Sequence, residues 1–159
     1  MKKTLWIVAF TCLLSIQLRA QVQVFAGDGY QFHTLVLRLD RGRTMPPYSY
    51  NINDALYTVT GHKIMEGPMG SEFDLVYTIR DNKVYTGTAM YSSQIRYTFM
   101  DGRLYKGDST FLLDVLYNVN NNVIYAGANS FPTDAIYLIE GQVGLSQLVA
   151  ILLSLGLID

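Results

Sequence analysis

The chain of 159 residues carries 12 Lys and Arg against 13 Asp and Glu, with 50% hydrophobic residues and a single cysteine. This near-neutral balance lacks the basic surplus that nucleic-acid binding requires. One cysteine excludes a framework of intrachain disulfides and a cysteine-based zinc site, while the length allows an ordinary single-domain core.

Residues 1–20 have the pattern of a bacterial secretory signal peptide. Lys2 and Lys3 precede a largely apolar run over 4–16, and the segment ends at the small residue Ala20. The run is too short to span a bilayer. A lipoprotein acylated at Cys12 is the alternative, although residues 9–11 match the usual acylation motif poorly. The sequence therefore predicts a protein that is secreted or periplasmic and that could associate with the cell surface.

Cleavage after Ala20 would leave a mature chain with no cysteine. It would also remove Lys2, Lys3 and Arg19, which leaves nine basic residues against 13 acidic ones and a net charge of −4. We therefore expect no nucleic-acid partner, and we expect packing alone to stabilise the fold.

A gapless repeat of 20 residues fills most of the mature chain. Its most regular positions are a tyrosine column and a glycine column, which comprise Tyr57, Tyr77, Tyr97, Tyr117 and Tyr137, and Gly67, Gly87, Gly107 and Gly127. A degenerate copy lies near the start, where VFAG at 24–27 matches IYAG at 124–127. Such self-similarity indicates a repeat architecture.

Each repeat is predicted to be a β-hairpin. Apolar residues alternate with period two, as at Leu75, Tyr77 and Ile79, which is typical of a strand. A turn signal such as Asp81-Asn82 follows, and a second strand leads to the repeated glycine. About six such hairpins over residues 21–143 predict an all-β antiparallel meander that closes into a barrel-like or prism-like body; a β-solenoid is the alternative.

The final segment, 144–159, departs from the repeat. Leu145, Leu148, Val149, Leu152 and Leu155 have helical spacing, and the segment is too short for a membrane span. We predict a short C-terminal helix that caps the exposed core of the repeat domain, since terminal repeats need such a cap. Docking to a membrane or a partner is the alternative.

Two aromatic columns compete as binding surfaces. The tyrosine column sits between apolar neighbours, which favours a place in the wall with the hydroxyl at the rim. A second column lies on the opposite face of the hairpins and is the predicted binding site for a protein or glycan partner; it comprises Met65, Tyr85, Tyr105 and Tyr125.

The sequence predicts no metal, no cofactor and no enzyme activity. Asp54, Asp74, Asp114 and Asp134 recur once per repeat, whereas calcium loops concentrate several oxygen ligands in a dozen residues, so we interpret them as turn residues. His33 and His62 are isolated, and no nucleophile or zinc motif is present. Glu66, Glu72 and Asp74 could pair as acid and base, but no second group supports them.

The motifs Asp74-x-x-Tyr77 and Tyr85-x-Gly87 resemble those of secreted bacterial proteins built from tandem units of the form Asp-x-x-Tyr … Ile-Tyr-x-Gly. The resemblance covers residues 35–143 and implies the repeat architecture, with no activity attached. MORN repeats are similar in general architecture only, because their Gly-x-Gly core is absent. Curli-type fibre subunits share a signal followed by five units, without the Gln and Asn columns that such fibres stack.

The sequence thus favours an exported, non-enzymatic β-repeat protein that binds a protein or glycan, because repetition produces extended surfaces rather than a unique pocket. A structural or fibre-forming extracellular subunit is the alternative function.

Overall fold

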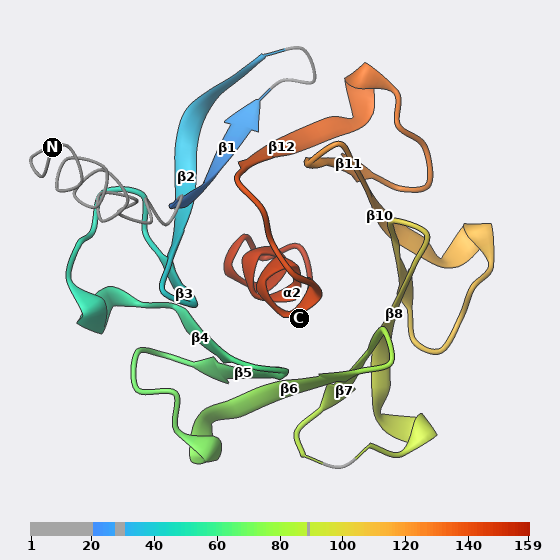
Figure 1. Cartoon of the computed structure of the whole chain (residues 1–159). Helices are drawn as coiled ribbons and strands as arrows, with labels where there is room; N and C mark the ends of the chain where they lie inside the picture. The colour runs from blue at the N-terminus through green and yellow to red at the C-terminus, as the bar shows by residue number, and fades with distance from the viewer. Residues whose placement is uncertain (1–20, 28–30, 89) are drawn as a thin grey trace, which may run out of the picture.

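The chain folds into a closed barrel of twelve antiparallel strands. The computed structural model describes residues 21–27, 31–88 and 90–159. Figure 1 shows the strands as a ring around a central helix. They are β1 (Val22–Gly27), β2 (Phe32–Asp40), β3 (Arg43–Met45), β4 (Tyr57–Thr60), β5 (Lys63–Glu66), β6 (Leu75–Arg80), β7 (Lys83–Thr86), β8 (Ile95–Met100), β9 (Arg103–Lys106), β10 (Val115–Asn120), β11 (Val123–Ala126) and β12 (Ala135–Glu140). The predicted meander and its closure are confirmed, and the solenoid alternative is not.

The sixth hairpin is assembled from both ends of the repeat region. Five hairpins pair consecutive strands from β2–β3 to β10–β11, whereas β12 pairs with β1, where Val24 lies opposite Ile139. The VFAG segment at 24–27 therefore supplies the second strand that the last repeat lacks. Because β1 also pairs with β2, the described strands form a ring without a free edge.

At one end of the barrel, a tight turn joins the two strands of each hairpin and hydrogen-bonds to the next hairpin. Asp81 and Asn82 adopt positive φ angles of 50° and 61°, as the turn signals predicted. The carbonyl of Asn82 accepts a hydrogen bond of 2.7 Å from the backbone N–H of Phe99 in the next hairpin. At the equivalent turn, the carbonyl of Gly102 accepts the same bond from Val119 at 2.7 Å, so the turn and the next hairpin are close together in each case.

At the other end, the chain leaves each hairpin and makes an excursion that we call a petal loop. These petal loops span residues 46–56, 67–74, 87–94, 107–114 and 127–134, and they project outward in Figure 1. Each contains a one-turn 3₁₀ helix before the next strand, which is η2 (Ile52–Asp54), η3 (Glu72–Asp74), η4 (Ser92–Gln94), η5 (Leu112–Asp114) or η6 (Pro132–Asp134).

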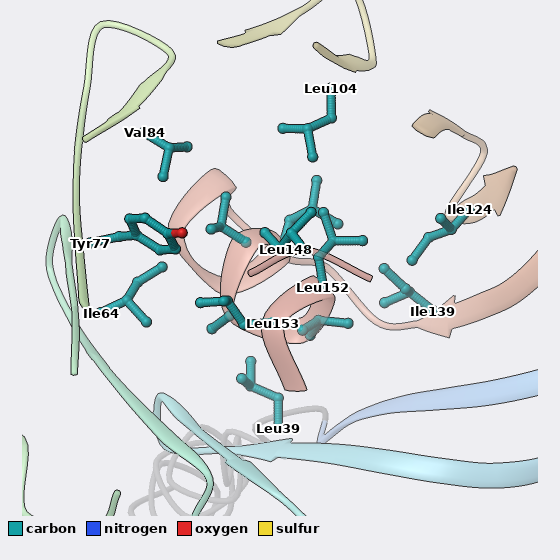
Figure 2. Close-up of a cluster of buried hydrophobic side chains, with 14 of the residues drawn as sticks. Leu39, Ile64, Tyr77, Val84, Leu104, Ile124, Ile139, Leu148, Leu152 and Leu153 are labelled. Atoms are coloured by element: carbon teal, nitrogen blue, oxygen red, sulfur yellow. The ribbon is translucent and has the colours of Figure 1, made fainter. Parts of the chain in front are cut away.

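The C-terminal helix α2 (Leu145–Ser154) lies inside the barrel and packs against β2 to β5. All six residues from 148 to 153 are buried, on every side of the helix. Figure 2 shows Leu148, Leu152 and Leu153 surrounded by inward side chains of the wall, among them Leu39, Ile64, Val84, Leu104, Ile124 and Ile139. None of the helices in the described ranges is long and apolar enough to cross a membrane.

The short C-terminal helix is thus confirmed, but its place differs from that of the predicted cap over the end of the repeat domain, residues 144–159. The prediction considered only one apolar stripe of the helix. Ile151 and Leu153 lie outside that stripe, and they make the helix apolar around its whole circumference. A helix that is apolar all round must be enclosed on all sides, and the lumen of the barrel encloses it.

One polar contact fixes the helix in the lumen. Thr44 occupies the wall position that is aliphatic in the later hairpins, and it is fully buried. The hydroxyl of Ser154 donates to Oγ1 of Thr44 at 2.8 Å, and Oγ1 also accepts from the backbone N–H of Tyr57 at 3.0 Å. The Ser154 hydroxyl also lies 2.7 Å from the carbonyl oxygen of Ala150 in its own helix. Since the equivalent wall positions 64, 84, 104 and 124 have no hydroxyl, the contact with Thr44 favours one rotation of the helix.

Replacement of Leu152 by Ala should destabilise the protein strongly, since it opens a cavity between helix and wall. We expect a loss of about 2–5 kcal/mol in the free energy of unfolding, measured by urea denaturation. Leu113→Ala is the matched control, because Leu113 is 99% exposed and the same change there removes no packing. Equal losses in the two variants would contradict the enclosed position of the helix.

Candidate functional site

The tyrosine column lines the lumen and holds the end of the chain. Tyr77 and Tyr97 are 2% and 4% exposed, with their rings edge to face at a centroid distance of 6.2 Å. The hydroxyl of Tyr77 donates to the carbonyl of Asp159, and that of Tyr117 donates to the carbonyl of Leu157 at 3.0 Å. The hydroxyls therefore bind the segment that follows α2.

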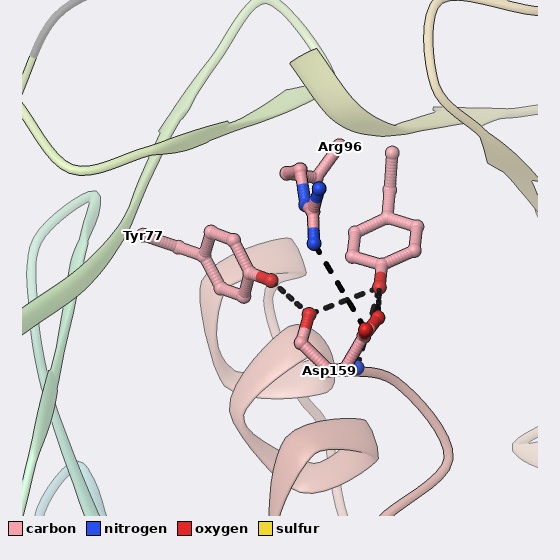
Figure 3. Close-up of polar contacts among 4 residues, drawn as sticks. Tyr77, Arg96 and Asp159 are labelled. Atoms are coloured by element: carbon pink, nitrogen blue, oxygen red, sulfur yellow. Dashed lines mark hydrogen bonds and ion pairs between the residues drawn. The ribbon is translucent and has the colours of Figure 1, made fainter. Parts of the chain in front are cut away.

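Asp159 is the centre of this polar cluster, which Figure 3 shows. The Tyr97 hydroxyl lies 2.7 Å from Oδ1 of Asp159 and 3.0 Å from its carbonyl oxygen. A guanidinium nitrogen of Arg96 lies 3.9 Å from Oδ2. The hydrogen bond from Tyr97, with smaller contributions from the charges of Arg96 and Lys106, holds the pKa of the Asp159 carboxyl below its ordinary value. Burial, and then the bond to Asp159, raises the pKa of Tyr97.

A shallow hollow of about 300 Å³ opens beside this cluster, at the barrel end from which the petal loops leave. Tyr97, Lys106, Leu116 and the tail residues 156–159 line it. The tyrosine hydroxyls and Arg96 already bind the tail residues 157–159. The polar groups beside this hollow therefore serve mainly to anchor the chain end.

The predicted binding column lies in a buried outer layer. Met65 and Tyr105 are each 2% exposed, Tyr85 is 9% exposed, and Tyr125 is half-buried. A Cβ on Gly70 would lie 3.4 Å from Cε of Met65, so the petal loop over 67–74 lies against that side chain. These side chains point away from the lumen, as the alternation predicted, but their burial leaves little surface for a partner. Their role in binding stays a prediction, and their burial favours a packing role.

A threonine opposite Met65, Tyr85 and Tyr105 anchors the loop that follows, and Asn118 has this position opposite Tyr125. Thr78 lies opposite Tyr85 across the hairpin, and its hydroxyl donates to the carbonyl of Gly87 at 2.6 Å. Thr58 and Thr98 make the same bond to Gly67 and Gly107. The repeated glycine is therefore the point where each petal loop is tied back to the wall.

The aspartate column lies in the petal loops. Asp54 accepts a hydrogen bond of 2.5 Å from the Ser49 hydroxyl, and Asp114 accepts one from the Ser109 hydroxyl. Both aspartates end their 3₁₀ helices, which fits the interpretation as turn residues. Within the described ranges, no three His, Cys, Asp or Glu side chains are grouped so that they could hold a metal ion.

The isolated acidic and histidine residues do not form a constellation with one another. Glu72 pairs with Lys63, and this bond lowers the pKa of the Glu72 carboxyl. His33 is exposed and bonds to the side chain of Gln31 at 2.7 Å. His62 lies exposed in a hairpin turn.

The largest exposed apolar side chains gather in the petal loops, a feature that the sequence analysis missed. Every petal loop carries at least one exposed aromatic ring, from Tyr48, Tyr50, Phe73, Tyr91, Phe111 and Phe131. Phe111, Leu112 and Leu113 are consecutive and exposed. The available signal was the presence of large apolar residues in segments that are otherwise polar and lie outside the strand pattern. Such a concentration marks an interaction surface.

The stability of the protein should depend on pH through Asp159. Its pKa is lower in the folded state than in the unfolded chain, so its contribution is full above the unfolded pKa, about 4, and is lost as pH falls through the folded pKa. Asp159→Asn should therefore lower the stability at pH 7, with a difference from the original protein that shrinks toward pH 3 in urea denaturation.

Asp101→Asn is the control for this titration, because Asp101 lies in a turn with a positive φ angle that Asn also adopts. It should leave the stability at pH 7 close to that of the original protein. A difference between Asp159→Asn and the original protein that is constant from pH 7 to pH 3 would contradict the assignment.

Comparisons with known proteins bear on the architecture. No curated protein and no solved structure matches the chain. The family model for the 6-fold beta flower protein matches residues 24–152, from the closing strand β1 into α2. This match supports the repeated β-hairpin architecture and carries no information on the likeness to MORN repeats. Six hairpins closed around one helix, and a match over most of the chain, place this chain in the 6-fold beta flower protein family.

Proposed function

We propose that the protein is an exported, non-enzymatic binding module that docks a protein partner through its petal loops. The observation that carries this proposal is the exposure of large apolar side chains there, with Phe73 fully exposed and Leu113 at 99%. The inner core is filled by α2, so these residues are not needed to complete the fold.

The composition of the petal loops favours a protein partner over a glycan. Ile52, Met69, Leu112 and Leu113 add exposed aliphatic and thioether groups to the aromatic rings. Large aromatic and Met side chains are enriched at protein interfaces. Because the loops are spaced around the barrel, several of them can contact one partner or a repeated partner, and linked contacts of this kind raise the total affinity.

A fibre-forming role has less support. Assembly through cross-β pairing requires strands with free edges. The described strands form a closed ring, which leaves a fibre no edge on which to extend.

Replacement of Phe73, Phe111 and Leu113 together by Ser should abolish partner binding while the melting temperature changes by a few degrees at most. The measurement is surface plasmon resonance of the mature chain against purified envelope and secreted proteins of the source organism, with a glycan array in parallel. Asn53→Ser, Ser93→Ala and Thr133→Ser together form the matched control, since these exposed residues are polar members of the petal loops. Retained protein binding in the Ser variant, or binding to glycans alone, would contradict the proposal.

Export is a further part of the proposal, and it depends on residues 1–20, which lie outside the described residues. Expression of the full chain in a bacterial host should give an exported product whose first residue is Gln21, as measured by intact-mass spectrometry. Retention of the full chain in the cytoplasm would contradict export, and a lipid-modified product that starts at Cys12 would replace this proposal with the lipoprotein alternative.

A further inference from the structure

The hairpin β2–β3 differs from the other five in its charge. Where later hairpins have Thr58, Thr78, Thr98 and Asn118, it has Arg38, and where their turns begin with Gly or an acidic or amide residue, it has Arg41. Arg43 adds a third guanidinium group on β3. The hairpin β2–β3 and the petal loop 46–56 that follows it, which together we call the first petal, are therefore the part of the repeat with the most altered charge.

Arg38 is a buried charge without an acidic partner. It is 4% exposed, and its guanidinium group lies 4.2 Å from the centroid of the Tyr50 ring. Nη1 donates to the carbonyl of Ser49 at 3.2 Å, and the amide oxygen of Gln21, when turned toward the group, accepts from Nε at 2.8 Å. None of the ion pairs among the described residues involves Arg38. Burial of an unpaired charge is costly, so this region retains a positive charge that favours an anion nearby.

Arg41 occupies a backbone conformation that disfavours it. Its φ angle is 48°, in the left-handed region where the equivalent turns have Gly61, Asp81, Asp101 and Asn121. Gly, Asn and Asp tolerate this region, whereas a longer side chain is uncommon there. A strained residue that the fold does not require is a candidate for a functional role.

Arg41 and Arg43 border a hollow of about 240 Å³, which is lined by Asp40, Arg41, Arg43, Met45, Tyr50 and Ile52. Arg43 donates through Nε to the carbonyl of Pro68 at 3.2 Å, which holds its side chain against the next petal loop. Tyr50 is 85% exposed, so the ring face that does not cover Arg38 is accessible. The hollow thus combines cationic donors with an accessible aromatic ring.

A second hollow supplies an internal comparison. It lies on the third hairpin, has a volume of about 400 Å³ and is lined by His62, Ile79, Arg80 and Met90. Its one guanidinium group is paired with Asp81 at 3.4 Å, and Met90 stands at the repeat position of Tyr50. This second hollow is larger, but it has no unpaired guanidinium group and no aromatic ring. We therefore expect it not to bind an anion.

We propose that the hollow of the first petal binds an acidic monosaccharide unit, a uronate. The guanidinium groups of Arg41 and Arg43 bind its carboxylate, since Arg matches carboxylates in charge and shape. The apolar C–H face of the sugar ring lies on Tyr50, and the carboxylate of Asp40 accepts hydrogen bonds from ring hydroxyls. A volume below the 300–1,000 Å³ of drug-sized pockets suits one sugar unit. This site is additional to the docking of a protein by the petal loops.

The test is a titration of the mature chain with glucuronate, followed by protein-observed NMR. We expect saturable shifts confined to residues 40–43 and to the surroundings of Tyr50, and no shifts with glucose, the neutral sugar of the same shape. Arg41→Asn should weaken binding at least tenfold, which is about 1.4 kcal/mol. Asn is native to the equivalent turn at Asn121, so this variant should retain or increase the melting temperature.

Arg80→Asn removes a guanidinium group from the second hollow and should leave glucuronate binding unchanged. The absence of localised shifts, or unchanged affinity in Arg41→Asn, would overturn the proposed site. Equal binding of glucose would overturn the role of the cations. Equal binding of N-acetyl-glutamate amide, which has a carboxylate but no sugar ring, would overturn the assignment to a sugar.

Discussion

The enclosure of an apolar helix by the barrel is the interaction on which the rest of the structure depends. About eight strands make a barrel that wall side chains alone can fill. This barrel has twelve strands, and its lumen is filled because α2 lies within it and buries residues 148–153. Ile64, Val84, Leu104 and Ile124 stand on successive hairpins and are fully buried by the same packing. Helix and wall therefore stabilise each other, since neither could shield its apolar surface alone.

The wall repeats around a single helix, so several rotations of the helix would pack similarly, and polar contacts select one of them. The aliphatic positions of successive hairpins are similar, so apolar packing alone distinguishes poorly among rotations of the helix. Thr44 and Ser154 form a buried pair on one side. The hydroxyls of Tyr77, Tyr97 and Tyr117 bind the tail on the other. The tyrosine of each repeat packs in the wall, and in Tyr77, Tyr97 and Tyr117 its hydroxyl also binds the tail residues 157–159.

The outer surface is free to vary because the fold is stabilised from within. Each hairpin adds a small outer layer, in which a side chain such as Tyr85 packs between Thr78 and Ile95 and the petal loop is tied back through the repeated glycine. Beyond that layer the loops have no packing role that requires one residue type. The exposed rings lie in this variable part, and the hollow beside Arg41 and Arg43 is lined in part by Tyr50 and Ile52 of a petal loop, so both proposals for binding involve these loops.

The sequence by itself determined the hairpin repeat, the strand and turn positions, and the degenerate repeat copy at 24–27. These follow from local rules, because alternation and positive φ angles are properties of neighbouring residues. The exposure of apolar residues in the petal loops was not predicted. Whether Phe73 or Leu113 is exposed depends on which surfaces the rest of the chain covers. The tertiary structure decided three matters: α2 lies inside the barrel, Met65 and Tyr105 are buried, and Arg38 has no acidic partner among the described residues. The physical reason is that each of these features depends on which surfaces come into contact when the ring closes. Contacts between segments distant in the sequence cannot be predicted from a local residue pattern.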